Sequence, residues 1–232
     1  MQGNDLMDYL DGVAVVDLEA TSLNTRKGAI ASVGMVTFRD GELKRYYRVF
    51  RPFRGAKIDK SALAVCGFTL NELNRKCDCK DGEDNCKVLE HAHSPERVCS
   101  YVSEFMHENQ CHTIAGQNPA FDTGYLHAYF ERYKRFDFIS HRTIDLHSIG
   151  YGHLASRGMK VPVDHARDGK VSYVRNDFSA TKLYRLIGMP TEPKPHNALT
   201  GALFEFEAFC RLIYKKPVLE EFKMYKLRTE IL

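Results

Sequence analysis

Alternation of apolar and polar residues predicts β-structure in the N-terminal part of the chain and again near its middle. Two apolar runs come first, and a third stretch alternates behind the dipeptide Asp40-Gly41, which is typical of a tight hairpin turn. Two shorter runs of the same kind follow further along. We therefore expect five strands, at Val13–Asp17, Ile30–Phe38, Glu42–Phe50, Cys111–Gly116 and Arg142–Leu146.

Apolar residues spaced three and four apart predict helices between and after these strands. The helical periodicity covers residues 94–109, 123–133, 179–187 and 198–214. Strands mixed with helices in this way are typical of the α/β class, here a mixed five-stranded sheet flanked by helices. Because there is no internal repeat and no low-complexity linker, we expect a single domain, residues 1–232, with a core at about 11–214.

Three segments stand outside this core pattern. Residues 76–93 and 159–175 look inserted, and Asp168-Gly169 in the second favours another hairpin. Residues 215–232 form a tail in which basic and apolar residues are spaced to suit an amphipathic helix. Such a tail either packs on the domain or meets a protein partner.

Composition narrows the class of protein without identifying it. Of the 232 residues 44% are hydrophobic and 27% are charged, and no apolar run is long enough to cross a bilayer. Residues 1–12 are acidic and lack the basic start and apolar core of a signal peptide, so we expect a cytoplasmic or otherwise intracellular location. The net charge of +3 permits a polyanionic partner but does not demand one.

The cysteines bear on redox state and on zinc. Seven cysteines at irregular spacing favour reduced thiols over a disulfide framework. Thiolates at Cys77, Cys79 and Cys86, with His91, His93 and Cys99 nearby, have the softness that Zn²⁺ prefers. Their spacing differs from the usual Cys-x₂-Cys knuckle, and a polar acidic loop with free thiols is the alternative interpretation.

The first candidate chemistry is the tripeptide Asp17-Leu18-Glu19 at the end of a predicted strand. Residues two apart in a strand project from the same side of the sheet, so the two carboxylates repel each other unless a cation lies between them. Carboxylate oxygens are the ligands that Mg²⁺ and Mn²⁺ prefer. Taken alone, the tripeptide is more often a solvated strand end.

Four separated segments resemble the motifs of one enzyme family. Residues 15–23, Val-Val-Asp-Leu-Glu-Ala-Thr-Ser-Leu, resemble the first motif of the DnaQ-like (DEDDh) 3′-to-5′ exonucleases. Residues 30–36 and 58–69 resemble two further family segments. Residues 117–122, Gln-Asn-Pro-Ala-Phe-Asp, resemble the second acidic motif, with Gln in place of its first His. The resemblance spans roughly residues 11–214 and implies a ribonuclease H-like fold.

The resemblance implies that Asp122 is a metal ligand together with Asp17 and Glu19. Taken alone, Asp122 stands directly before the predicted helix 123–133 and would be its N-cap. Considered together with Asp17 and Glu19, Asp122 is better interpreted as a metal ligand than as an N-cap. Asp145 also matches a family segment, but the role implied for it is structural, and we do not count it as a ligand.

His196 opens a third motif whose final acid is absent. Residues 196–201 read His-Asn-Ala-Leu-Thr-Gly where the family has His-x-Ala-x-x-Asp. The resemblance implies that His196 is the general base and that Gly201 removes one negative metal ligand. A glycine inside a helix also costs about 1 kcal/mol relative to alanine.

Three explanations of Gly201 stay open: a disabled enzyme, a site with three carboxylates only, or a neighbouring acid in the missing role. The best substitute is Glu205, one helical turn on and on the same face as Gly201. One turn displaces the backbone by about 5.4 Å along the axis, and we expect the longer side chain of Glu to recover only part of that distance.

In a competent site the implied reaction is two-metal hydrolysis of the phosphodiester at a nucleic-acid 3′ end, with Mg²⁺ or Mn²⁺ as the ions. The family resemblance implies that the backbone near Ala20 and Thr21 holds the terminal nucleotide and that Leu23 wedges against its base. The partner would be single-stranded DNA or RNA, with scattered Lys and Arg along its path. The alternative function is a non-catalytic nucleic-acid-binding or partner-binding module that retains the fold.

Overall fold

The computed structural model describes residues 10–75, 91–168, 171–176 and 178–228. The chain divides into two compact units. Unit 1 comprises residues 1–144 and 192–206, and unit 2 comprises residues 145–191 and 207–232. None of the helices in the described ranges combines the length and the apolar character needed to cross a bilayer.

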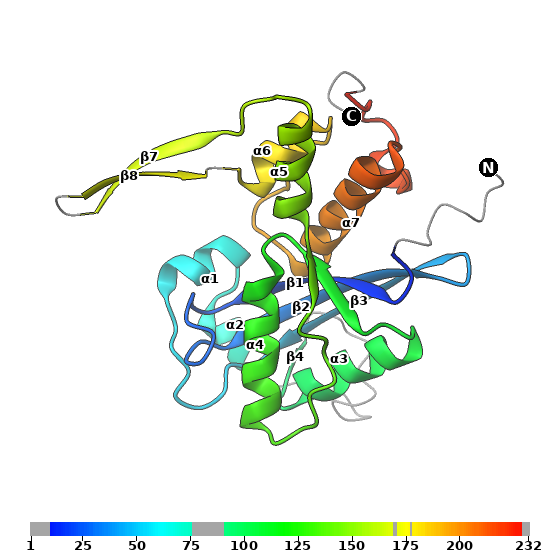
Figure 1. The fold of residues 1–232 in the computed structure, drawn as a ribbon. Helices are drawn as coiled ribbons and strands as arrows, with labels where there is room; N and C mark the ends of the chain where they lie inside the picture. Colours follow the sequence, from blue (N-terminus) through cyan, green and yellow to red (C-terminus); the bar gives the residue numbers. More distant parts are fainter. Residues whose placement is uncertain (1–9, 76–90, 169–170, 177, 229–232) are drawn as a thin grey trace. The chain divides into compact units, whose positions relative to one another are not determined.

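Unit 1 is built on a mixed six-stranded sheet in the order β4-β3-β2-β1-β5-β6 (Figure 1). The strands β1, β2 and β3 form an antiparallel meander, β5 runs parallel to β1, and β4 runs parallel to β3. The strands are β1 (Val13–Ala20), β2 (Ile30–Arg39), β3 (Glu42–Phe50), β4 (Ala92–His93), β5 (Thr113–Gly116) and β6 (Thr143–Asp145).

The expected α/β class and all five expected strands are confirmed. The sheet has six strands and not the five expected. The additional strand, β4, has two residues, and so short a segment carries no alternation that a sequence pattern could reveal. Strand β1 also continues to Ala20, so the acids at 17 and 19 lie inside the strand instead of at its end.

Helices cover both faces of this sheet. Alternate residues of β1, among them Ala14, Val16 and Leu18, pack in one core with α3 (Arg97–Glu108) and α4 (Pro119–Arg132). A second, smaller core lies on the other face, where Tyr47 and Val49 of β3 meet the short helices and Ala198. The short helices are α1 (Lys60–Cys66) and α2 (Leu70–Asn74), and Ala198 is the first residue of α7 (Ala198–Tyr214).

The sequence pattern did not predict α1 and α2, because helices of seven and five residues show too few turns for a helical period. A local signal was present for α2. The Thr69 side chain accepts a hydrogen bond from the backbone of Glu72, and the Glu72 carboxylate accepts one from the Thr69 backbone N–H at 2.7 Å. This reciprocal capping box starts the helix.

Unit 2 contains two helices, a hairpin and the second part of α7. The hairpin joins β7 (Val163–Asp168) to β8 (Val171–Asn176) in antiparallel register, as the Asp168-Gly169 dipeptide predicts, and it extends away from the two helices (Figure 1). The helices are α5 (Leu146–Ser156) and α6 (Ala180–Leu186). Helix α5 was not predicted, although Asp145 accepts hydrogen bonds from the backbone of His147 and Ser148 as its N-cap.

The prediction of an amphipathic helix in the tail is wrong for the described part of the tail, residues 215–228. Only the 3₁₀ turn η3 (Glu220–Phe222) is regular, and the Leu219 and Phe222 side chains are buried. The carbonyl groups of Phe222 and Tyr225 accept hydrogen bonds from the buried Arg211 side chain. An α-helix would use such carbonyls within its own backbone, so this side chain holds the tail in an irregular path.

Candidate active site

Strand β1 presents Asp17 and Glu19 on one face of the sheet, opposite the face that packs on α3 and α4. Asp17 pairs with Gly34 of β2, and Glu19 pairs with Ser32. The register then shifts between Glu19 and Ala20, which bulges the strand just past the two acids. Glu19 is buried, and Asp17 keeps part of its surface exposed.

Helix α4 brings Asp122 to the same strand. The Leu18 backbone N–H, between the two acids of β1, donates to the Asp122 carboxylate at 3.0 Å. The N-cap interpretation of Asp122 was wrong, because α4 begins earlier. Asn118 caps the helix in a left-handed conformation (φ 58°), and Pro119 takes the first turn, where a missing N–H costs nothing.

The first turn of α7 lies directly against the sheet beside these acids. A Cβ atom on Gly34 would lie 2.1 Å from the carbonyl oxygen of Ala198, so only glycine permits this approach. Asn197, directly before α7, caps the helix: its side-chain oxygen accepts hydrogen bonds from the backbone N–H groups of Leu199 and Thr200 at 3.0 and 3.2 Å.

Gly201 lies against the Asp17 carboxylate. A Cβ atom at position 201 would lie 2.0 Å from Asp17 Oδ2 and 2.8 Å from its Cγ. The space that a side chain at 201 would use is therefore occupied by the side chain of Asp17.

Two further carboxylates lie near these residues. From the sequence, Glu205 was named as the best substitute for the missing acid and was expected to fall short, and Glu192 was not considered. Glu205 is buried, and one of its oxygens, Oε2, has no hydrogen-bond partner. Glu192 is partly buried, with its Oε1 buried and also without a partner. We refer to Asp17, Glu19, Asp122, Glu192 and Glu205 together as the acidic cluster.

The pKa values of the cluster show how close its members are. Burial and then the charge of Glu192 raise the pKa of Asp17 to about 7. Burial and then Asp17 and Glu192 raise the pKa of Glu19 to about 9. For both acids, loss of solvation disfavours the charged form and like charges add to the effect.

Asp122 and Glu205 behave in the same way. Burial raises the pKa of Asp122 well above its usual range, and the charge of Asp17 adds to it. Burial does the same to Glu205, followed by Asp17 and Asp122. Mutual repulsion thus links Glu205 to the two acids that come from β1 and α4.

His196 lies in the segment leading into α7. Its backbone N–H donates to the carbonyl oxygen of Val65 at 2.9 Å. Burial raises the pKa of Glu192, while the attraction of His196 lowers it, so the imidazole and this carboxylate are neighbours. His196 also lines a cavity of about 480 Å³ together with Cys66, Phe68 and Asn197.

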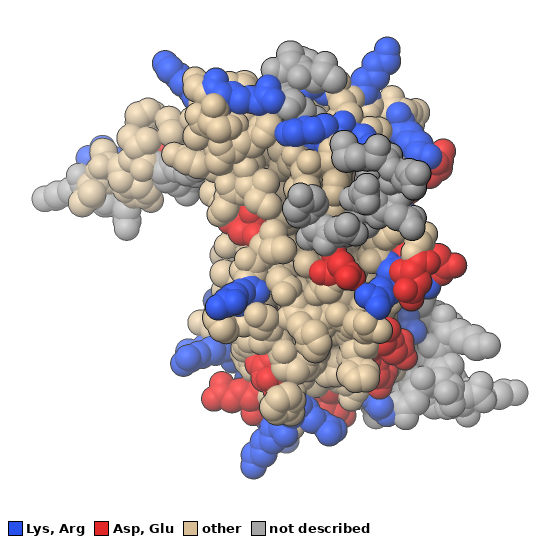
Figure 2. Space-filling model, turned by 45° about the vertical axis from the view of Figure 1, so that its right-hand side comes forward, with Lys and Arg blue, Asp and Glu red and all other residues tan. Residues whose placement is uncertain are grey.

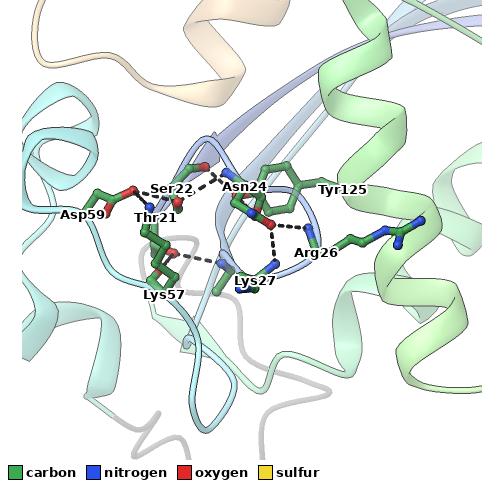
Figure 3. A network of polar contacts seen from close by, with 9 residues as sticks. Thr21, Ser22, Asn24, Arg26, Lys27, Lys57, Asp59 and Tyr125 are labelled. Atoms are coloured by element: carbon green, nitrogen blue, oxygen red, sulfur yellow. Dashed lines mark hydrogen bonds and ion pairs between the residues drawn. The ribbon is translucent and has the colours of Figure 1, made fainter.

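The loop after β1 is tightly held by hydrogen bonds (Figure 3). The Thr21 hydroxyl donates to the Lys57 carbonyl and accepts from the Ala29 N–H, both at 2.8 Å. Ser22 donates to Asp59 at 2.7 Å, and Tyr125 of α4 donates to the Ser22 carbonyl at 2.5 Å. Figure 3 shows these side chains converging on the loop from α4 and from the segment before α1.

Leu23 projects from this rigid loop with 84% of its surface exposed. Ala20 lies at the end of β1, partly exposed, and the Thr21 N–H donates to the Ala29 carbonyl at 2.9 Å. An apolar side chain held in water on an ordered loop is available to contact a ligand.

The donor set of the acidic cluster fits a divalent metal. All its donors are carboxylate oxygens, which suit Mg²⁺ and Mn²⁺, and two of the oxygens are buried without a partner. Within the described ranges, however, no group of three or more His, Cys, Asp or Glu side chains is already arranged around one point. The side chains are near enough to repel one another, and a bound ion would have to draw their oxygens inward.

The zinc prediction falls largely outside the described residues, because Cys77, Cys79 and Cys86 lie there. Cys99 and His93 are described, and both are buried. Among the described cysteines, Cys66, Cys99, Cys111 and Cys210 are unpaired thiols.

Comparison with known proteins defines the class of fold. No family model matches the chain. The mixed sheet with its flanking helices matches the ribonuclease H-like nuclease fold of solved structures of E. coli Exonuclease I. The Exonuclease I complex with a dT13 oligonucleotide aligns with a TM-score of 0.63 at 12% identity over 88% of this chain. A zinc-ion-bound Exonuclease I complex with single-stranded DNA gives a TM-score of 0.63 at 13% identity, also over 88% of this chain.

This chain spans about 40% of the length of Exonuclease I. At such low identity the likeness establishes the fold and not the activity.

Proposed function

We propose that this chain is a metal-dependent 3′-to-5′ exonuclease acting on single-stranded DNA or RNA. The observation that carries the proposal is that the Leu18 N–H, between Asp17 and Glu19 on β1, donates to the Asp122 carboxylate of α4 at 3.0 Å, which brings the three acids near one another. Burial and like charges raise their pKa values. Buried carboxylates that repel one another are costly, and a divalent cation is the partner that offsets the cost.

Asp17, Glu19 and Asp122 would hold the metal ions, and His196 would accept the proton of the attacking water. Two divalent ions in such a site supply a hydroxide nucleophile and stabilise the charge on the phosphate and the leaving 3′-oxygen. The product would be a 5′-mononucleotide. The first turn of α7 lies beside these ligands, with Gly201 against the Asp17 carboxylate.

Two surface features support a nucleic-acid substrate. Exposed Leu23 on its rigid loop is suited to stack on a terminal base without reading its identity. Among the described residues of unit 2, Lys and Arg outnumber Asp and Glu. Figure 2 shows exposed Lys and Arg side chains spread over the face in view. Such a surface attracts phosphates.

The test is nucleotide release from a single-stranded oligonucleotide in Mn²⁺. A substrate labelled at its 3′ end should release labelled mononucleotide first, whereas a 5′ label should stay on progressively shorter fragments. The variants Asp17→Asn and Asp122→Asn should lose at least about 100-fold in rate, more than the loss of an outer partner of a metal ligand costs.

The matched control is Glu131→Gln, which changes an exposed acid on the same helix as Asp122 and should leave the rate unchanged. Loss of the 5′ label first would show the opposite direction. Tight oligonucleotide binding without cleavage in Mn²⁺ or Mg²⁺ would favour the non-catalytic binding module instead.

A further inference from the structure

A side chain at position 201 would overlap the Asp17 side chain as it lies in the structure. A Cβ atom there would come within 2.0 Å of Asp17 Oδ2, and α7 cannot back away without losing its contact with Gly34 of the sheet. Any side chain at 201, including a carboxylate, would therefore push the Asp17 side chain out of its present position.

One turn further along α7, at Glu205, the structure does have room for a carboxylate. Glu205 reaches into the acidic cluster with 6% of its surface exposed, and its Oε2 is buried without a hydrogen-bond partner. This oxygen lies 3.2 Å from the point that a Cβ atom on Gly116 would occupy, so a glycine at the end of β5 makes room for it. Burial raises the pKa of Glu205, and the charges of Asp17 and Asp122 add to the effect.

A purely structural acid would not be left in this state. The Gln117 backbone donates a hydrogen bond to the Glu205 carboxylate, but its Oε2 is left without a donor. An unpartnered buried oxygen costs free energy, and structural buried acids are normally fully hydrogen-bonded. The open oxygen of Glu205 points to a partner of opposite charge shared with Asp17 and Asp122.

We propose that Glu205 supplies the fourth carboxylate of the divalent-metal site and that Gly201 is required to let Asp17 and Glu205 share that site. The inference rests on the proposed metal site, but not on nuclease activity. It reverses the meaning of Gly201, since a carboxylate at 201 would disrupt the site instead of completing it. The earlier expectation that Glu205 falls short considered only the rise along the helix axis and not the closeness of α7 to the sheet.

The experiment measures Mn²⁺ binding to the full chain by calorimetry, without nucleic acid. Glu205→Gln should weaken the Mn²⁺ affinity by at least about 10-fold, as losses around metal sites do. Gly201→Ala and Gly201→Asp should both weaken it, because each adds the Cβ atom that displaces Asp17. Glu131→Gln should bind Mn²⁺ like the unmodified chain.

Opposite results would overturn the proposal. Tighter Mn²⁺ binding by Gly201→Asp, with Glu205→Gln unchanged, would show that position 201 lacks a ligand and that Glu205 is not one. Absence of Mn²⁺ and Mg²⁺ binding by the unmodified chain would overturn both this inference and the proposed function. Metal binding that depends on Glu205, without nucleotide release, would leave the inference standing and the proposed function refuted.

Folding is followed by thermal unfolding of each variant in EDTA. If Glu205→Gln does not fold, Glu205→Asp provides the same test, because it keeps the charge and withdraws the carboxylate by one methylene. Affinity of Glu205→Asp equal to that of the unmodified chain would contradict a ligand role.

Discussion

The two units bury charge in contrasting ways. In unit 2, Arg211 and Glu207 are completely buried, and the Arg211 Nε donates to the Glu207 carboxylate at 2.7 Å. The remaining guanidinium hydrogens go to backbone carbonyls at 3.0 to 3.2 Å, those of Ile187, Gly188, Phe222 and Tyr225. The second Glu207 oxygen accepts from the backbone of Val218 and Leu219.

In unit 1 the acidic cluster gathers like charges, and none of its pKa shifts has a lysine or arginine among its causes. Glu205 and Glu207 are two residues apart on one helix, yet one carboxylate has an open buried oxygen and the other has a donor for each oxygen. A buried charge with every partner present is suited to hold structure. A buried charge left unmatched is suited to bind a cation.

The largest effect on stability is expected from breaking the buried ion pair between Arg211 and Glu207. Arg211→Met should lower the free energy of unfolding by about 3–5 kcal/mol, because it leaves Glu207 charged and buried without its partner. Urea unfolding measures this loss, and the double variant Glu207→Gln/Arg211→Met should recover part of it. Mn²⁺ affinity should not change. A loss below about 1 kcal/mol would contradict a structural role for the pair.

Because of the acidic cluster, the free energy of unfolding of the metal-free protein should fall as the pH rises. A pKa raised by folding means that the folded protein holds protons that the unfolded chain has lost. For Asp17 this stability is full below the ordinary value of 3.8 and is lost as the pH rises through about 7. For Glu19 the window runs from 4.5 to about 9. Asp122, Glu192 and Glu205 face these two acids, and His196 faces Glu192.

Urea midpoints in EDTA across this range measure the decline, and Mn²⁺ should flatten it by neutralising the charge. A metal-free midpoint that rises between pH 5 and 9 would contradict the assignment.

Neutralising one member of the cluster should stabilise the metal-free protein. Asp122→Asn keeps an oxygen that can accept from the Leu18 N–H and cannot take the negative charge that burial and Asp17 disfavour, so we expect a gain of about 1 kcal/mol or more at a pH where Asp122 is ionised. In saturating Mn²⁺ the unmodified chain should become the more stable of the two. Destabilisation in EDTA would mean that Asp122 is matched by a partner after all.

The sequence predicted those features of the candidate site that follow from local secondary structure. The period of two in a strand places Asp17 and Glu19 on one face whatever the rest of the chain does. Asp122 was found through its motif, but its place in the helix was misjudged, because the left-handed Asn118 that starts α4 is visible only in the backbone.

Glu205 and Glu192 depend on tertiary contacts. The role of Glu205 follows from how closely α7 approaches Gly34, which no helical period encodes. Glu192 lies in an irregular segment, and no spacing rule connects it to β1. The tail was misjudged for a similar reason, since Arg211, which precedes the tail in the sequence, donates hydrogen bonds to carbonyl groups that a helix would use within its own backbone.

The smallest expected effect concerns Glu192, at the partly exposed edge of the cluster. Glu192→Gln removes the like charge with the largest effect on Asp17. Carboxylate titration by NMR should show the Asp17 midpoint moving to lower pH, while Glu131→Gln leaves it in place. The gain in metal-free stability should stay under about 1 kcal/mol, because solvent screens part of an exposed charge. If the titration midpoint of Asp17 does not move, Glu192 does not belong to the acidic cluster. The cluster would then consist of Asp17, Glu19, Asp122 and Glu205.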